Sequence, residues 1–147
     1  MPSRWSGRDT QTLSAAAMSA LLLASATKHF DDPGFFAPVV PDFLCRDDTG
    51  ERPNSPVAVL SREEWIALSG LLEAGAAVGL LIPATRRAAA GCIAAMFTAF
   101  LAGHLEALRK AYGPDGTPGQ RRAHTLRLPL QAPLIAWAWS LRSPVRR

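Results

Sequence analysis

The sequence predicts an all-α integral membrane protein, a four-helix bundle that runs up, down, up and down through a bilayer. Two apolar runs, 65–83 and 88–105, are each long enough to cross the ~30 Å hydrocarbon core at ~1.5 Å rise per residue. The short basic turn that separates them contains Arg86 and Arg87. Charged residues are clustered between the apolar blocks, whereas a soluble amphipathic helix shows them every turn or two.

The 147 residues are predicted to form a single domain with spans at about 10–27, 64–83, 87–108 and 124–141. The first span follows two arginines and contains a moderately apolar stretch that resembles the core of a signal peptide, but the hydrophobic spans after it favour a retained signal anchor. A long, proline-rich and charged loop follows it, and we expect this loop to form a re-entrant or surface element at the interface. Its apolar residues are Phe35, Phe36, Val39, Val40, Phe43 and Leu44.

The later spans carry local signals of helix starts and close packing. Ser61 followed by Glu64 predicts a capping box at the start of the second span, and Trp65 is expected to anchor it at the interface. Gly75 and Gly79 form a small-xxx-small pair that allows a neighbouring helix to approach closely. The third span opens with three alanines and a glycine, and the fourth contains two prolines and ends in two tryptophans before a basic tail.

Charge and cysteine usage limit the partners that we expect. The net charge is +4, but the basic residues flank apolar spans and form no stripe with interleaved aromatics, so we expect the lipid bilayer and not nucleic acid as the partner. Their density in the shortest segments favours both termini in the cytoplasm. The two cysteines, Cys45 and Cys92, lack the spacing of a zinc or redox motif, so no metal site is expected.

Five polar residues are predicted to outline an intramembrane pocket. The ends of the spans bring His29, His104, Arg127 and Gln131 to the side of the membrane from which the second span enters, and Glu73 lies about 13 Å deeper along that span. A carboxylate in hydrocarbon costs at least ~2.5 kcal/mol, so we expect Glu73 to pair with Arg127 or a histidine. Three alternatives stay open: Arg127 snorkels to the interface, the histidines are interfacial, and Glu73 makes a structural hydrogen bond to a neighbouring helix.

Several short segments together resemble a known family. They are His29-Phe30 with Pro33 and Phe35, Val40-Pro41, Trp65 with Ser69-Gly70 and Glu73, Ile82-Pro83-Ala84-Thr85-Arg86-Arg87, Arg127-Leu128-Pro129-Leu130-Gln131, and Trp137-Ala138-Trp139. In this combination the chain resembles the DoxX-like family of small four-helix membrane proteins over residues 15–141. It departs from that family at His104, where similar sequences tend to carry asparagine. The resemblance implies a bacterial inner-membrane protein, and some relatives are associated with thiosulfate:quinone oxidoreductase or with membrane redox complexes.

Three functions are compatible with these features. The first is an accessory or anchoring component of a membrane redox system, with a redox subunit as partner and a quinone as a possible ligand of the pocket. Independent catalysis is not expected, because the chain has no flavin, nucleotide or haem fingerprint and no CxxC pair. The second is a proton- or solute-conducting protein in which Glu73 titrates, which would require a homo-oligomer. The third is a purely structural membrane protein whose polar residues specify helix packing.

Overall fold

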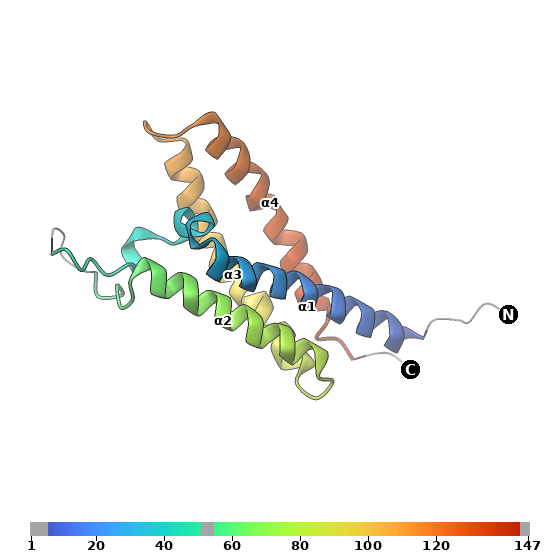
Figure 1. Ribbon diagram of the computed structural model, residues 1–147. Coiled ribbons are helices and arrows are strands. Elements are labelled where there is room, and N and C mark those ends of the chain that lie inside the picture. The colour runs from blue at the N-terminus through green and yellow to red at the C-terminus, as the bar shows by residue number, and fades with distance from the viewer. Residues whose placement is uncertain (1–5, 51–54, 145–147) are drawn as a thin grey trace.

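The computed structural model describes residues 6–50 and 55–144, and the regular secondary structure in these ranges is helical (Figure 1). An isolated bridge between Cys45 and Leu60 is the one β-type pairing within them. The all-α prediction is therefore confirmed. The elements in chain order are α1 (Gly7–Asp31), the 3-10 helices η1 (Pro33–Phe35), η2 (Ala37–Val39) and η3 (Asp42–Leu44), then α2 (Arg62–Leu81), α3 (Arg86–Ala111) and α4 (Pro118–Ser140).

Side-chain caps explain where the helices begin. The predicted capping box of α2 is confirmed: Glu64 Oε2 accepts from the backbone N–H of Ser61 at 2.7 Å, and Ser61 Oγ accepts from that of Glu64 at 3.2 Å. α4 starts earlier than predicted, at Pro118 instead of residue 124, because Thr117 and Gln120 form another capping box. α1 likewise extends past residue 27 to Asp31.

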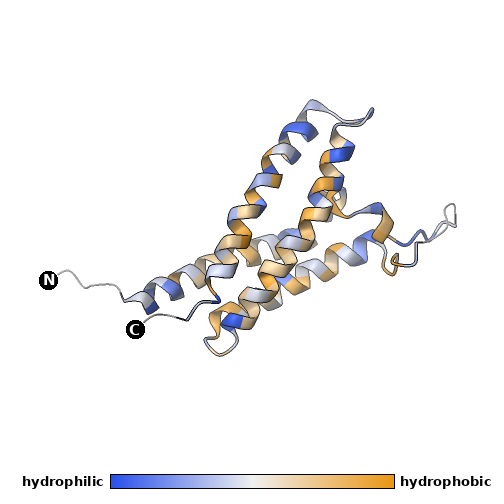
Figure 2. Cartoon of the chain, turned by 180° about the vertical axis from the view of Figure 1, so that it is seen from behind, coloured by the Kyte–Doolittle hydropathy of each residue, from blue (hydrophilic) through white to orange (hydrophobic). Residues whose placement is uncertain are grey.

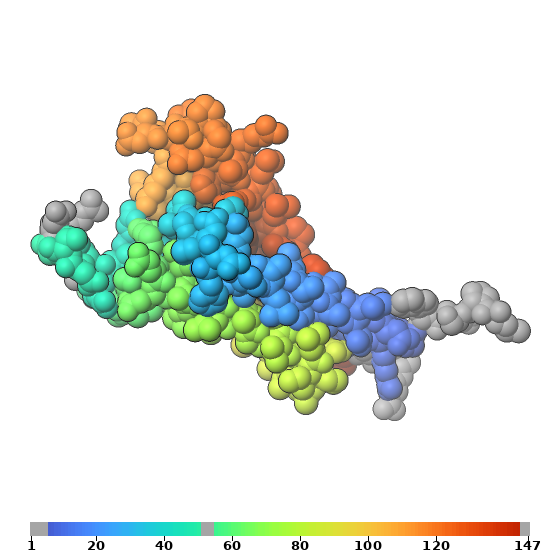
Figure 3. Space-filling view, in the orientation of Figure 1, coloured from blue at the N-terminus to red at the C-terminus, as the bar shows by residue number. Residues whose placement is uncertain are grey.

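The four α-helices form two antiparallel hairpins, α1 with α2 and α3 with α4 (Figure 1). The start of α1 and the end of α4 lie at the same end of the molecule as the α2–α3 turn, as an up-down-up-down order requires (Figure 1). The hairpins part from each other away from that end (Figures 1 and 2). The segment between α1 and α2 occupies the place where they part, and its blue-to-cyan surface lies between α2 and α4 in Figure 3.

Small residues form much of the contact between the helices. The core joins alanines of all four α-helices, such as Ala15 and Ala138, with a few large side chains such as Met18 and Ile93. Of the predicted glycine pair, Gly79 allows α2 and α3 to approach closely, because a Cβ at this position would lie only 2.9 Å from Ala89 Cβ. Gly75 makes no such close contact, since a Cβ at this position would meet no heavy atom within 4 Å.

Many large apolar residues of the helices are exposed, and hydrophobic positions recur along all four α-helices (Figure 2). Two of the four predicted spans, α2 and α3, are long and apolar enough to cross a membrane, and only 28% of the most apolar stretch of each is buried. A core helix of a soluble protein can have the same length and composition but is mostly buried. Among the described helices, α1 and α4 do not meet this criterion. Exposed examples on α2 and α3 are Leu68, Leu71, Leu72, Val78, Leu81 and Leu105.

Candidate functional site

A cavity of about 250 Å³ lies between the two hairpins. All four α-helices and the segment between α1 and α2 contribute to its lining. Most of the lining is apolar, and its polar members include the whole set that the sequence singled out. These predicted residues are His29, Glu73, His104, Arg127 and Gln131. The structure thus brings all five together at one cavity, which lies where the hairpins diverge.

Glu73 projects from α2 and is 3% exposed. Its Oε2 has no hydrogen-bond partner, and His29 Nδ1 lies 3.9 Å away. His29 Nδ1 already bonds the carbonyl oxygen of Ser25 at 2.9 Å, so it donates one turn back along α1 and not to Glu73. α1 comes this close because Gly70 lies one turn before Glu73, where a Cβ would be 2.8 Å from His29 Cβ.

Arg127 does not form the ion pair with Glu73 that we considered. Within the described ranges, no salt bridge joins these two residues. The Arg127 guanidinium instead lies over the ring of Phe35, 4.2 Å from its centroid. Phe35 packs edge-to-face on Phe36, which in turn stacks on the His29 ring at a centroid distance of 3.6 Å. A chain of contacts thus runs from the cation of α4 through the two aromatic rings to His29, the neighbour of Glu73.

His104 and Gln131 join α3 to α4 at the cavity. Gln131 Nε2 lies 2.9 Å from His104 Nε2, and Gln131 is 8% exposed. This contact leaves His104 Nδ1 and Gln131 Oε1 buried without a hydrogen-bond partner. Buried polar atoms of native proteins are nearly always satisfied, by protein, ordered water or a bound molecule. Three residues of one cavity, with Glu73 included, thus carry polar atoms that the protein itself does not satisfy.

The segment 33–44, which we call the lid, covers one side of the cavity. It contains the three 3-10 helices and contributes Phe35, Phe36, Val39 and Val40 to the lining. The predicted surface or re-entrant element is therefore a packed part of the site. Its close approach to α3 depends on Gly103, since a Cβ at this position would run into the carbonyl oxygen of Val39.

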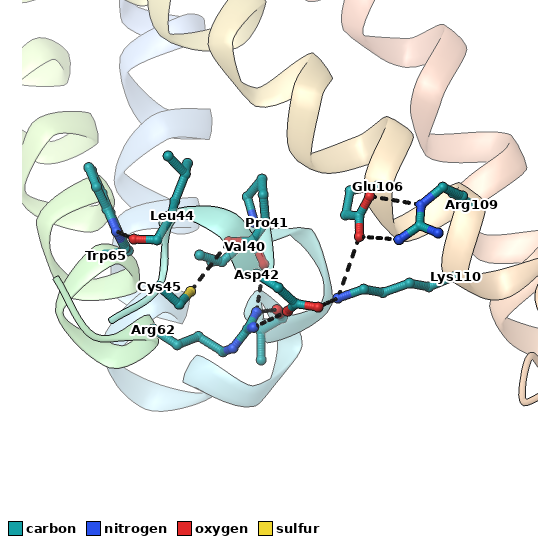
Figure 4. Close-up of polar contacts among 11 residues, drawn as sticks. Val40, Pro41, Asp42, Leu44, Cys45, Arg62, Trp65, Glu106, Arg109 and Lys110 are labelled. Carbon is teal, nitrogen blue, oxygen red and sulfur yellow. Dashed lines mark hydrogen bonds and ion pairs between the residues drawn. The ribbon is translucent and has the colours of Figure 1, made fainter. Parts of the chain in front are cut away.

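Two basic residues from different hairpins hold the lid (Figure 4). Arg62, at the start of α2, donates to the carbonyl oxygens of Ala37 at 2.7 Å and Val40 at 2.6 Å, and it pairs with Asp42. Lys110, near the end of α3, lies 2.6 Å from the second carboxylate oxygen of Asp42. Asp42 thus connects the lid to both hairpins, and we call the group Asp42, Arg62 and Lys110 the latch.

The latch shifts the acidity of Asp42. The hydrogen bond from Lys110, followed by that from Arg62, holds the pKa of Asp42 below its ordinary value, although burial acts in the opposite direction. Cys45 lies just after the lid, and its Sγ is 3.4 Å from the carbonyl oxygen of Pro41. Burial raises the pKa of this thiol, so its nucleophilic thiolate form is disfavoured.

Other contacts continue around the latch. Trp65, the predicted interfacial anchor, donates its indole N–H to the carbonyl oxygen of Leu44 at 2.8 Å. Glu106 bonds Arg109 at 2.7 Å and lies 3.8 Å from Lys110 (Figure 4). Sequence reasoning missed the latch, although the apolar residues and closely spaced prolines of the loop indicated an ordered segment there.

Comparison with known families assigns the chain. Residues 18–142 match the family described as a domain of unknown function, DUF8561. The chain belongs to this DUF8561 family. The match covers the cavity and the lid, from within α1 to the end of α4. Neither a curated protein nor a solved structure matches the chain.

The DUF8561 assignment corrects the resemblance to the DoxX-like family, which was wrong. Each segment that carried the resemblance was short and rich in proline, alanine, tryptophan or arginine. Such residues recur at the ends of apolar helices because they cap helices, break them or anchor them. Their combination therefore indicated a helical layout and not membership of the DoxX-like family.

Proposed function

We propose that this DUF8561 protein is a small integral membrane protein that holds a lipophilic small molecule in the cavity between its hairpins. The observation that carries the proposal is the set of three buried, unpartnered polar atoms at a mostly apolar cavity: Glu73 Oε2, His104 Nδ1 and Gln131 Oε1. Ligand sites typically combine apolar walls with a few polar groups, and their volumes start at about 300 Å³. A cavity of about 250 Å³ therefore suits a small molecule or one end of a longer amphiphile.

The distribution of side chains on α2 supports the membrane part of the proposal. The buried face contains Glu73 and Ala77 beside Ile66 and Leu80, whereas Leu71, Leu72 and Val78 are more than half exposed. Water would favour an arrangement with these exposed apolar residues inside and the carboxyl group outside. In a bilayer, small and polar residues form the helix contacts and large apolar residues face lipid. The start of α1 and the end of α4 lie at the same end of the molecule, which supports an orientation with both on one side of the membrane, and the cytoplasmic location of the termini stays a prediction from charge.

The accessory role in a redox system stays a prediction with less support than before. It was motivated by the cavity and by the resemblance, and the family assignment removes the second argument. A quinone and a redox subunit therefore enter as outcomes of the experiments and not as premises. The predicted location in the inner membrane of a bacterium rested on the same resemblance, so the family assignment removes that argument too.

Proton or solute movement is a second candidate function, favoured by the approach of His29 to Glu73. Both side chains are titratable and buried, 3.9 Å separates His29 Nδ1 from Glu73 Oε2, and ionisable residues inside membranes often mark proton pathways. Proteoliposomes with an imposed pH gradient test this function. A flux in the wild type that is abolished in Glu73→Ala supports it, and equal rates in protein-containing and empty liposomes contradict it.

Cysteine labelling tests whether the chain crosses a membrane. Cys92 is exposed on α3, six residues after the helix begins at Arg86. In a Cys45→Ser background and in opened membrane vesicles, we expect a membrane-impermeant maleimide to label Cys92 only after detergent is added. Asp48→Cys in the Cys45→Ser, Cys92→Ser background is the control, because it lies in an exposed loop and should react in both conditions. Equal labelling of Cys92 with and without detergent would contradict membrane insertion.

Ligand-dependent stability tests the binding part. The full chain, washed in mild detergent, is heated with and without a lipid extract of its native membrane. A ligand that is present at about 100 times its Kd adds about 2.7 kcal/mol to the free energy of unfolding, which raises the melting temperature measurably. We expect the rise in the wild type and in Gln11→Leu, whose side chain bonds Ser143 at the other end of the molecule, but not in Gln131→Leu. An equal response of all three proteins would contradict the proposal.

A further inference from the structure

We propose that the molecule held in the cavity is uncharged and has a polar head that both donates and accepts hydrogen bonds, such as a hydroxyl or amide group. The inference rests on the proposed binding function and concerns the class of ligand. It follows from the three unpartnered polar atoms at the cavity, from the two formal charges that line it, and from its size.

The pair of His104 and Gln131 requires a head group that both donates and accepts hydrogen bonds. If Gln131 Nε2 donates to His104 Nε2, the neutral ring carries its proton on Nδ1, so the free atoms are one donor and one acceptor, Gln131 Oε1. If the amide is turned over, Gln131 Oε1 accepts from His104 Nε2. The free atoms are then an amide donor and a bare Nδ1 acceptor. Either orientation leaves one donor and one acceptor to be satisfied.

Glu73 and Arg127 together require a head group that is uncharged. Glu73 Oε2 accepts a hydrogen bond when the carboxyl group is ionised, and the protonated group both donates and accepts. Arg127 lines the same cavity with the opposite formal charge, and no salt bridge in the described part of the chain joins it to Glu73. A charged head placed between them would be repelled by one of the two, and an ion buried without its own counter-ion is costly. An uncharged head avoids both penalties.

These requirements exclude the simpler classes of polar head. A ketone or quinone accepts hydrogen bonds but donates none, so the free acceptor of the His104–Gln131 pair would stay unsatisfied. An ammonium group donates but cannot accept, and a carboxylate accepts but cannot donate. A hydroxyl or amide group can do both at once. A quinol thus fits the cavity where the quinone does not.

The apolar walls set the size of the remainder. Phe36, Phe97 and Phe100 line the cavity from the lid and α3, and Leu134 lines it from α4. An engineered apolar cavity of about 150 Å³ binds benzene. The present cavity, at about 250 Å³, therefore has room for a substituted ring or for a comparable aliphatic group.

Two matched probes test the inference. Para-propylphenol has a hydroxyl that donates and accepts, whereas para-propylanisole has the same ring and chain and an ether that only accepts. Isothermal titration calorimetry of the full chain in detergent micelles, with empty micelles subtracted, gives both Kd values. We expect the phenol to bind at least about tenfold more tightly, because a site built to hydrogen-bond a hydroxyl rejects an analogue that cannot donate.

Variants test which residues cause the preference for the phenol over the anisole. The double variant with His104→Phe and Gln131→Leu removes every hydrogen-bonding atom of the pair and should bring the ratio of the two Kd values close to one, whereas either single substitution leaves a free donor and a free acceptor on the other side chain and should keep the preference. Leu134→Ala is the control, because it changes the apolar wall and should alter both Kd values by the same factor. Equal binding of the two probes to the wild type would overturn the proposed head group and leave a ligand cavity. Binding of neither probe, together with no response to the membrane extract, would overturn the binding function itself.

Discussion

Lys110 Nζ lies 2.6 Å from Asp42 Oδ2, across 68 positions of the sequence. Because Asp42 also pairs with Arg62, a single carboxylate connects the lid to α2 and to α3. The lid supplies aromatic walls to the cavity, so this contact joins the geometry of the loop to that of the site. The position of the lid is accordingly the first property to test.

Asp42→Asn should loosen the lid without unfolding the helices. Asp42 is half exposed, so the loss in free energy of unfolding should be only about 1 kcal/mol, typical of partly exposed ion pairs. Limited proteolysis should cut within 33–44 several times faster in this variant than in the wild type. The control is Asp48→Asn, which removes the nearby Arg46–Asp48 pair, and lid cleavage at an unchanged rate is expected there. Equal rates in all three proteins would show that the latch does not hold the lid.

The latch also predicts a pH dependence. The pKa of Asp42 is below its ordinary value of 3.8 in the folded protein, so the unfolded chain takes up its proton at a higher pH. The contribution of the latch to stability should be complete above about pH 5 and should be lost as the pH falls through the folded pKa. The difference in free energy of unfolding between wild type and Asp42→Asn should thus be constant from pH 7 to 5 and shrink below about pH 4. A difference in free energy of unfolding that stays constant down to pH 3 would contradict a lowered pKa of Asp42 in the latch.

Two glycines should respond in opposite directions to alanine. Gly103→Ala places a Cβ against the Val39 carbonyl oxygen and should lower the free energy of unfolding by about 1–3 kcal/mol as the lid is displaced. Gly75→Ala adds its Cβ in open space within α2 and should raise the same quantity by up to about 1 kcal/mol. Denaturant titration measures both. A stabilising Gly103→Ala would mean that the lid does not lie against α3.

Glu73→Leu should stabilise the ligand-free protein while it abolishes binding. The substitution removes a buried polar atom that has no partner, and leaving such an atom buried costs about 1–3 kcal/mol. Glu63→Leu is the matched control, because Glu63 is exposed in the first turn of the same helix and should change stability by no more than about 0.5 kcal/mol. A strongly destabilised Glu73→Leu would indicate that the carboxyl group has a structural role.

The helices and the group of site residues could be predicted because both follow from the rise of an α-helix. Apolar runs located α2 and α3, and the capping box at Ser61 located the start of α2. The same rise placed Glu73 deeper than the residues at the other helix ends but below the same side of the bundle, and the five predicted residues do line one cavity. These inferences needed no knowledge of how the helices pack.

The lid and the partner of Arg127 could not be predicted, because they depend on contacts between distant residues. The 3-10 helices have no repeating apolar pattern, and Arg62 and Lys110 hold them from two different hairpins. Arg127 was considered as a partner of Glu73, but Phe35 lies under its guanidinium instead. The divergence of the hairpins has the same origin, since the lid occupies the space between them.

Co-purification tests most directly the central claim that the cavity at Glu73 holds a small lipophilic molecule. The full chain is isolated in mild detergent from its native membrane, and its organic extract is analysed by mass spectrometry in parallel with that of Glu73→Gln. We predict a small lipophilic molecule in near-stoichiometric amount with the wild type and much less of it with Glu73→Gln, at equal yields of folded protein. Wild type and Glu73→Gln extracts with the same composition, or without any such molecule, would contradict a ligand site at Glu73.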